Sequence, residues 1–167
     1  QDTFDNHHPL YAGDVGIGIN PALARRIESA DLIIALGPRL GEMTTGGYTL
    51  LKAPKTAQKL VHIHGGAEEL HRVYQADLAM NATMNAAARA LEVLSPPPEL
   101  PWEAWAHEAH ADYLANLKPQ TLPGLIDMPA IIDCIDRLLP ADAIVTNGAG
   151  NFASWMHRFH RHHGLAK

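Results

Sequence analysis

Apolar positions near the start of the chain follow helical spacing and then merge into a short continuous run. Asn20 and Pro21 suit the N-cap and the first turn of a helix, and apolar residues recur at helical spacing as far as Ala30. The run Leu32–Leu36 follows, between Asp31 and a glycine. A continuous apolar run of this kind is typical of a strand that is buried on both faces, as in a parallel sheet.

The alternation of strand and helix patterns continues to residue 94. The segment KLVHIHGG predicts a second strand over 59–64, and AEELHRVY predicts a short helix over 67–74. A third, briefer strand is predicted over 77–82, and the alanine-rich segment 83–94 predicts a helix with one apolar face. Strands that alternate with helices predict an α/β fold with a Rossmann-like open parallel sheet.

The composition changes at SPPPELP, residues 95–101, where four of seven residues are proline. Such a segment is typical of a semi-rigid linker. Beyond it, helices are predicted over 102–118, 130–140 and 151–164, the last ended by Gly164, and a strand over 142–147.

These patterns divide the chain into three parts. Residues 1–94 form a Rossmann-like domain, residues 95–126 form a proline-rich linker with a connecting helix, and residues 127–167 open a second α/β domain with an α-β-α unit.

Charge and composition restrict the classes of partner. The net charge is −5 and the isoelectric point is near 6.1, so no basic field attracts nucleic acid or anionic lipid. No stretch approaches the roughly 20 apolar residues of a membrane helix. Cys134 is the only cysteine, which excludes an internal disulfide. We therefore predict a cytoplasmic protein that binds neither nucleic acid nor membrane.

The segment IVTNGAGNFASW joins an apolar run to a helix start through two glycines. Gly148, Gly150 and Ala153 fit the G-x-G-x-x-G/A pattern, with Ala149 and Asn151 inside it. Free N–H groups at such a helix start can hold a phosphate or pyrophosphate. No Asp or Glu follows Asn151, so the acidic residue that NAD-binding folds place on the ribose is missing. A purely structural turn is the alternative.

A second candidate site follows the first predicted strand. Gly37, Pro38 and Arg39 lie where open α/β sheets bind ligands, at the carboxyl end of a strand. Arg39 can meet a phosphate or a carboxylate there, and a solvent-exposed arginine is the alternative. His62 and His64 lie two residues apart in the second strand and therefore point to one side of it, where we expect them at the rim.

The eleven histidines do not form a recognisable metal motif. Four of them crowd the last predicted helix, namely His157, His160, His162 and His163. Zinc sites need three or four ligands in a fixed arrangement, and no H-E-x-x-H is present. We predict no metal site and no catalytic acid or base within these residues.

Three segments, in order, together resemble the thiamine diphosphate-dependent enzymes of the acetolactate synthase type. HPLYAGDVGIGINPALARRIESADLIIALGPRLGEMTT and KLVHIHGGAEELHRVYQADLAMNATMNAAARAL resemble that family's central domain, here partial and within 1–94. DAIVTNGAGNFASWMHRFHRHHG resembles the start of its diphosphate-binding domain, within 127–167. The resemblance covers nearly the whole chain.

The resemblance implies thiamine diphosphate and Mg²⁺ as cofactors of a longer enzyme. By position, Gly148, Ala149, Gly150 and Asn151 match family residues beside the diphosphate. The glutamate that activates the thiazolium ring and the G-D-G…N magnesium motif have no counterpart in these residues. We therefore expect a fragment that is inactive alone.

Flavin binding is left open by the resemblance. In acetolactate synthases the segment matching Gly37, Pro38 and Arg39 touches the nucleotide of an FAD that has no redox role. The family's I-D-I-D at the end of the next strand is here IHGG, and Asn81 and Ala82 replace a usual Gly-Asp.

The function that the resemblance implies is carboligation or decarboxylation of a 2-keto acid by a homodimer or homotetramer. Two alternatives remain open from the residues themselves. One is an NAD- or FAD-binding oxidoreductase domain, favoured by the glycine turn, and the other is a non-catalytic interaction module, favoured by the lack of an acid–base pair.

Overall fold

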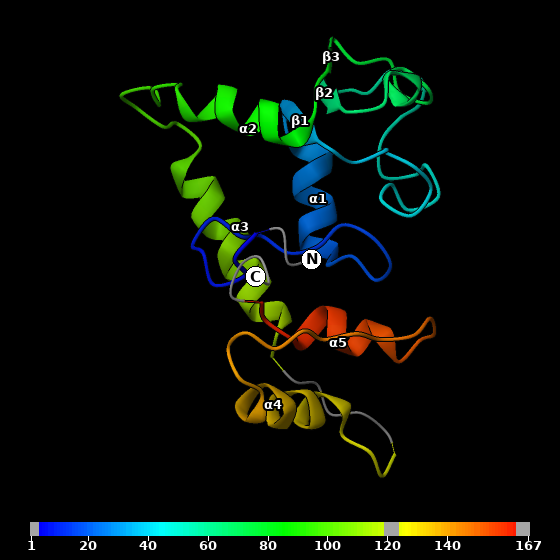
Figure 1. Cartoon of the computed structure of the whole chain (residues 1–167), viewed down its shortest axis with the longest axis vertical. Helices are drawn as coiled ribbons and strands as arrows, with labels where there is room; N and C mark the ends of the chain where they lie inside the picture. Colours follow the sequence, from blue (N-terminus) through cyan, green and yellow to red (C-terminus); the bar gives the residue numbers. More distant parts are fainter. Residues whose placement is uncertain (1–3, 119–123, 163–167) are drawn as a thin grey trace. The chain divides into compact units, whose positions relative to one another are not determined.

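The computed structural model describes residues 4–118 and 124–162 (Figure 1). Backbone contacts divide the chain into two compact units. The first, called the sheet unit here, comprises residues 15–17 and 24–101, and the second, the helical unit, comprises the described parts of 1–14, 18–23 and 102–167.

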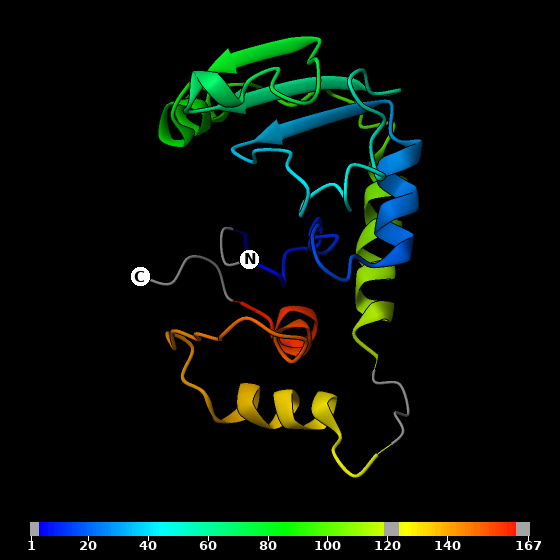
Figure 2. The same ribbon diagram turned by 90° about the vertical axis from the view of Figure 1, so that its right-hand side faces the viewer.

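The sheet unit contains three parallel strands, β1 (Leu32–Leu36), β2 (Lys59–His64) and β3 (Leu78–Asn81), in the order β1-β2-β3. Figure 2 shows the three arrows side by side and pointing the same way. Leu36 pairs with Ile63, and Ile63 with Met80, so the carboxyl ends of all three strands meet at one edge. The α/β fold with an open parallel sheet is confirmed.

Local hydrogen bonds explain where the helices of this region begin and end. In α1 (Pro21–Ser29), the Asn20 side chain accepts from the N–H of Ala22 at 3.0 Å, as expected of an N-cap. Gln58 donates its side-chain amide to the carbonyls of Ile27 and Glu28 at the other end. In α2 (Met84–Glu92), Thr83 caps the first turn.

The helix predicted over 67–74 is only a three-residue 3₁₀ helix, η1 (Ala67–Glu69). Leu70 already has an extended backbone, and His71 has a positive φ of 60°. Both conformations are incompatible with a continuing helix.

One face of the sheet carries the core. Ala35 and Leu60 are buried there with Leu40, Leu51 and Tyr74, and Ile27 of α1 packs against them. The other face is covered at Ile63 of β2, which is 5% exposed, but is open at β1. Leu32, Ile34 and Leu36 are 47%, 58% and 43% exposed, so the prediction that β1 is buried on both faces is wrong. Among the described residues of this unit, α2 packs mainly against β2.

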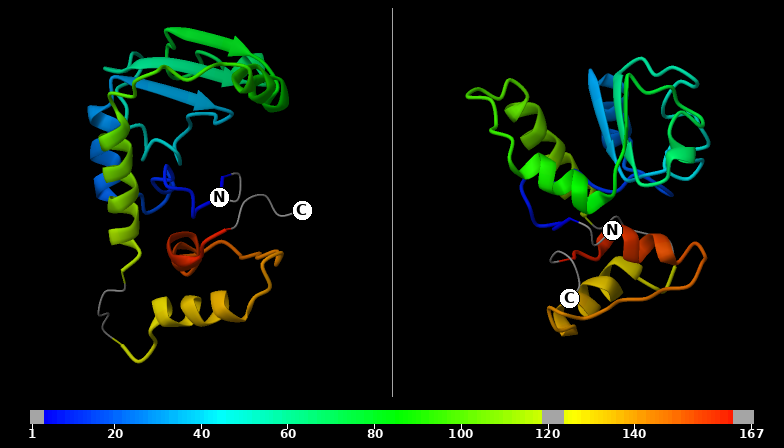
Figure 3. Two further views of the ribbon diagram at one scale, coloured as in Figure 1. Left: turned by 90° about the vertical axis from the view of Figure 1, so that its left-hand side faces the viewer. Right: turned by 45° about the horizontal axis from the view of Figure 1, so that its top comes forward.

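The helical unit contains α3 (Glu103–Asn116), α4 (Met128–Leu138) and α5 (Ala153–Phe159). Asp127 caps α4 by accepting from the N–H of Ala130 at 3.1 Å. Figure 3 shows α4 and α5 packed side by side, and the His160 ring is hydrogen-bonded to the Asp136 carboxylate of α4. The three helices were predicted in these places.

The predicted strand over 142–147 and the predicted end of the last helix differ from the structure of this unit. No strand forms over 142–147, because a strand needs a hydrogen-bonded neighbour and all strands among the described residues lie in the sheet unit. Helix α5 ends at Phe159, since His160 is extended. Gly164, the predicted end of this helix, lies outside the described residues.

Candidate cofactor-binding sites

The exit of β1 requires a glycine. Gly37 has a φ of +89°, and its N–H donates to the carbonyl of Ile63 at 2.9 Å. A Cβ atom here would lie 2.7 Å from Sδ of Met84, the first residue of α2. Glycine therefore allows the chain to turn sharply at the carboxyl edge of the sheet while α2 packs closely against the turn.

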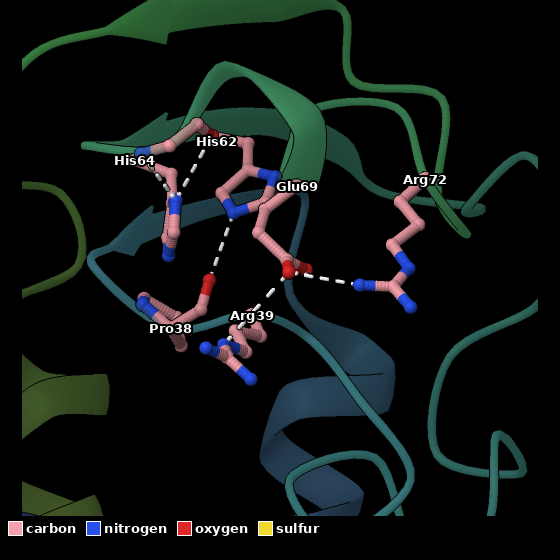
Figure 4. A network of polar contacts seen from close by, with 7 residues as sticks. Pro38, Arg39, His62, His64, Glu69 and Arg72 are labelled. Carbon is pink, nitrogen blue, oxygen red and sulfur yellow. Dashed lines mark hydrogen bonds and ion pairs between the residues drawn. The ribbon is translucent and has the colours of Figure 1, made fainter.

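His62 binds this turn from the neighbouring strand. Its side chain is buried, 2% exposed, and its Nε2 lies 2.8 Å from the carbonyl oxygen of Pro38 (Figure 4). Because a carbonyl oxygen only accepts, Nε2 carries the proton of this hydrogen bond. The register that places His62 opposite Ala35 makes the contact. His62 is thus buried in the interior, where it holds the Pro38 carbonyl in place. It does not lie at the rim of the sheet, as predicted from the sequence.

His64 is bound by its own turn. Its Nδ1 lies 2.9 Å from the backbone nitrogen of Gly66 and 3.1 Å from the carbonyl oxygen of the same residue. The side-chain amide of Asn81, at the end of β3, donates to the carbonyls of His64 and Gly65 at 3.0 and 3.1 Å. These bonds join the ends of β2 and β3.

Arg39 is a solvent-facing cation at this edge. Its side chain is 76% exposed and its Nε lies 3.9 Å from the carboxylate of Glu69, which also binds Arg72 at 2.8 Å (Figure 4). The Glu69 carboxylate is nearly buried between the two guanidinium groups. An anion approaching Arg39 would therefore compete with Glu69, although an exposed contact of this length is weak.

The carboxyl edge does not reproduce the ribose recognition of a dinucleotide site. Such folds place an Asp or Glu at the end of the neighbouring strand, and β2 ends in His64. Sequence reasoning found the Gly37–Arg39 turn from the strand end alone. It missed the roles of Glu69 and Asn81, because both depend on how separate segments are aligned in the sheet.

The second candidate site is the turn at residues 148–151 in the helical unit, which directly precedes α5. Gly150 has a φ of +152°, and a Cβ atom there would lie 2.6 Å from the ring of Phe152. At Gly148 the corresponding distance to Phe152 is 3.7 Å, an ordinary contact. The turn therefore needs a glycine at position 150 and tolerates a small side chain at 148.

The donors of this turn are available to a ligand. Residues 148–152 are all exposed. Within the described ranges, none of their backbone N–H groups donates a hydrogen bond to the protein, whereas the carbonyls of Gly150 and Asn151 accept from the start of α5. A row of exposed N–H groups can bind an anion. Helix α5 has only seven residues, so its dipole adds little to this turn.

Metal clusters and membrane helices are both absent from the described part of the chain. No three His, Cys, Asp or Glu side chains in residues 4–118 and 124–162 are grouped closely enough to hold a metal ion. In the same ranges, no helix has both the length and the apolar character needed to cross a membrane.

Comparison with known proteins identifies the class to which the fold belongs. Residues 1–91 match the family model of the thiamine pyrophosphate enzyme, central domain. The match covers more than half of the chain, and the chain belongs to this family of thiamine pyrophosphate enzymes. The resemblance stated from the sequence is confirmed.

Individual relatives agree on the family and differ in reaction. The chain is 25% identical to acetolactate synthase isozyme 2 large subunit of Escherichia coli (strain K12), over 89% of the chain and 26% of that protein. It is 25% identical to sulfoacetaldehyde acetyltransferase of Alcaligenes xylosoxydans xylosoxydans, over 92% and 30%. It is 23% identical to 3D-(3,5/4)-trihydroxycyclohexane-1,2-dione hydrolase of Clostridium perfringens, over 95% and 28%. The chain thus spans between a quarter and a third of the length of these relatives.

Proposed function

We propose that the chain is part of a thiamine diphosphate-dependent 2-keto acid carboligase or decarboxylase of the acetolactate synthase type, and that it is inactive alone. The observation that supports this most strongly is the match of residues 1–91 to the family's central domain. The relatives named acetolactate synthase and sulfoacetaldehyde acetyltransferase favour transfer of a carbon unit over the hydrolase reaction.

We assign the turn Gly148, Ala149, Gly150 and Asn151 to the diphosphate of the cofactor. Its exposed N–H groups would donate to the diphosphate oxygens, and the positive φ of Gly150 would keep them directed to one side. When bound with Mg²⁺, the cofactor supplies a carbanion that forms or cleaves the bond next to the keto carbonyl. The chain's own contribution is to hold and orient the diphosphate.

At the carboxyl edge of the sheet we assign no flavin-dependent step. Arg39 offers one exposed guanidinium for a nucleotide phosphate, but its neighbour Glu69 competes for it and β2 ends in a histidine. FAD binding through Gly37, Pro38 and Arg39 stays a prediction, as do a homodimeric or homotetrameric assembly and a cytoplasmic location.

The proposed function is tested by comparing this chain with the complete protein encoded around it. The complete protein should consume pyruvate or a related 2-keto acid only when thiamine diphosphate and Mg²⁺ are both present. The chain of residues 1–167 should show no turnover under the same conditions. Activity of the complete protein without thiamine diphosphate would contradict the function, and turnover by the chain alone would contradict its inactivity.

The competing oxidoreductase function rests on the G-x-G-x-x-A pattern and the parallel sheet. Titration calorimetry with NAD distinguishes the oxidoreductase function from the thiamine diphosphate-dependent function. We expect no measurable heat of NAD binding, whereas an NAD-dependent domain would bind NAD tightly.

A further inference from the structure

Three buried polar atoms in the helical unit lack hydrogen-bond partners. They are Asn6 Oδ1, the Tyr113 hydroxyl oxygen and Arg161 Nε, and no partner for them is found within residues 4–118 and 124–162. Asn6 and Tyr113 are only 4% and 5% exposed. An unpaired buried polar group typically costs about 1–3 kcal/mol, so native structures rarely leave three of them unexplained.

These atoms belong to one place, although their residues are far apart in the chain. Arg161 Nη2 donates to the backbone carbonyl of Asn6 at 3.3 Å, and the N–H of Asn6 donates to the carbonyl of His162 at 3.1 Å. Burial raises the pKa of Tyr113, while the Arg161 charge and the side chains of Arg161 and Asn6 act on the same phenol in the opposite direction. The phenol thus lies within weak hydrogen-bonding reach of both side chains, although none of these contacts has the geometry of a full hydrogen bond.

Within residues 4–118 and 124–162, the Arg161 guanidinium lacks an ion-pair partner. Among the described residues, Arg161 has no carboxylate within ion-pair distance. The nearby Arg158 is bound to the carbonyl of Asn116 at 2.6 and 2.9 Å, which leaves its charge uncompensated as well. The carboxylate of Asp136 is already taken by His160. A partly buried guanidinium is stable only with a partner.

We propose that Asn6, Tyr113 and Arg161 form a binding site for a small oxyanion, a carboxylate or a phosphate group. Arg161 Nε and the Tyr113 hydroxyl donate to its oxygens. The Asn6 amide donates as well after a 180° turn, which exchanges its oxygen and nitrogen without changing its shape. The Tyr113 hydroxyl, Arg161 Nε and the nitrogen of the turned Asn6 amide then each donate to the anion, which also neutralises the guanidinium.

This site is separate from the glycine turn at 148–151 and does not depend on the proposed function. A water molecule could satisfy the same atoms, but it would leave the Arg161 charge unbalanced. The two occupants differ in one measurable property, since only an oxyanion makes the stability of the chain depend on anion concentration.

The test is thermal unfolding of the chain in increasing acetate or inorganic phosphate at constant ionic strength, with chloride as the reference ion. We expect a saturable rise in melting temperature with at least one of the two oxyanions. Tyr113→Phe should weaken binding about tenfold, because it removes a hydrogen bond to a charged group. The same substitution should leave stability in chloride unchanged or slightly higher, because it removes an unsatisfied hydroxyl.

Two further variants complete the test. Arg161→Gln should abolish the oxyanion effect, while Arg89→Gln, an equal change of charge at an exposed position of α2, should preserve it. If Arg161→Gln does not fold, the oxyanion effect in Tyr113→Phe is compared with that in wild type, and this comparison decides whether the site exists. No saturable effect beyond that of chloride, or an equal effect in wild type and Tyr113→Phe, would overturn the proposal and leave a buried water as the occupant.

Discussion

Asp77 and Leu60 exchange two hydrogen bonds at the start of β3. The N–H of Asp77 donates to the carbonyl of Leu60 at 2.8 Å, and the N–H of Leu60 donates to Oδ2 of Asp77 at 3.0 Å. The other carboxylate oxygen binds Lys55 at 2.8 Å and lies 3.4 Å from Lys59. One side chain thus aligns β3 with β2 and closes the end of the sheet opposite the candidate ligand site.

This arrangement predicts that the sheet unit is sensitive to acid. The hydrogen bond from Lys55, then that from the Leu60 backbone, hold the pKa of Asp77 well below its usual range. A lowered folded-state pKa contributes stability above the ordinary carboxyl pKa of about 3.9, and this contribution is lost as the pH falls further. In Asp77→Asn, the midpoint of urea unfolding should therefore be lower at pH 7, and the loss between pH 5 and pH 3 should be smaller than in wild type.

Glu92→Gln is the matched control for this experiment, because Glu92 is an exposed carboxylate at the end of α2 in the same unit. Its acid dependence should match that of wild type. An Asp77→Asn variant with the same acid dependence as wild type would show that the carboxylate does not stabilise the sheet.

Gly37→Ala should destabilise the chain by about 1–2 kcal/mol, the cost of a left-handed backbone for a residue with a Cβ atom. The Met84 side chain can move away from the new methyl group, but the φ of +89° remains. Gly41→Ala, in the same loop, is the control because no atom lies within 4 Å of the position that its methyl group would take and its φ is not in that range. Chemical denaturation of the two variants measures the difference, and equal stabilities would contradict the assigned strain.

Tyr11 and Tyr113 make the chain sensitive to alkali. Their rings meet edge to face at 4.8 Å, and burial, with the charges of Tyr113 and Asp14, raises the pKa of Tyr11 to about 12. The neutral phenol is favoured in the folded state, so stability is complete below the ordinary tyrosine pKa of about 10 and falls as the pH rises from there toward 12.

Tyr11→Phe should reduce this alkaline loss, which can be followed by urea unfolding at pH 9, 10 and 11 together with the phenolate absorbance. Tyr48→Phe is the control, since Tyr48 is 43% exposed. If the alkaline loss is unchanged in Tyr11→Phe, the buried phenol is not its cause.

The order of helices and strands could be predicted from local patterns because each element carries its own periodicity and caps. The run Leu32–Leu36 predicted β1, and Asn20 with Pro21 predicted the start of α1. The open face of β1 could not be predicted, because a continuous apolar run has the same pattern whether one face or both are covered. The strand over 142–147 was predicted wrongly for a related reason. A run of apolar residues forms a strand only beside another strand that hydrogen-bonds to it, and the sequence pattern does not show whether such a neighbour is present.

The candidate sites show the same limit. Gly37–Arg39 and Gly148–Asn151 could be found because each is one continuous segment. The hydrogen bond from His62 to Pro38 depends on the pairing of β1 with β2, which no local pattern encodes. Asn6 and Arg161 are separated by 155 positions, so only the folded chain brings them together.

The two glycines of the turn at 148–151 give the sharpest test of its proposed role. Gly150→Ala should force the Phe152 ring or the backbone to move, since the methyl group would lie 2.6 Å from the ring, whereas Gly148→Ala adds only an ordinary contact at 3.7 Å. A displaced turn would redirect the N–H groups that we assign to the diphosphate.

In the complete protein, Gly150→Ala should weaken binding of thiamine diphosphate about tenfold or more, the loss expected for one hydrogen bond to a charged group. Gly148→Ala should bind within about threefold of wild type, well below that loss. Equilibrium dialysis with the cofactor and Mg²⁺ measures both, and unfolding curves show whether the variants are folded. If folded Gly150→Ala binds the cofactor as wild type does, the turn does not hold the diphosphate.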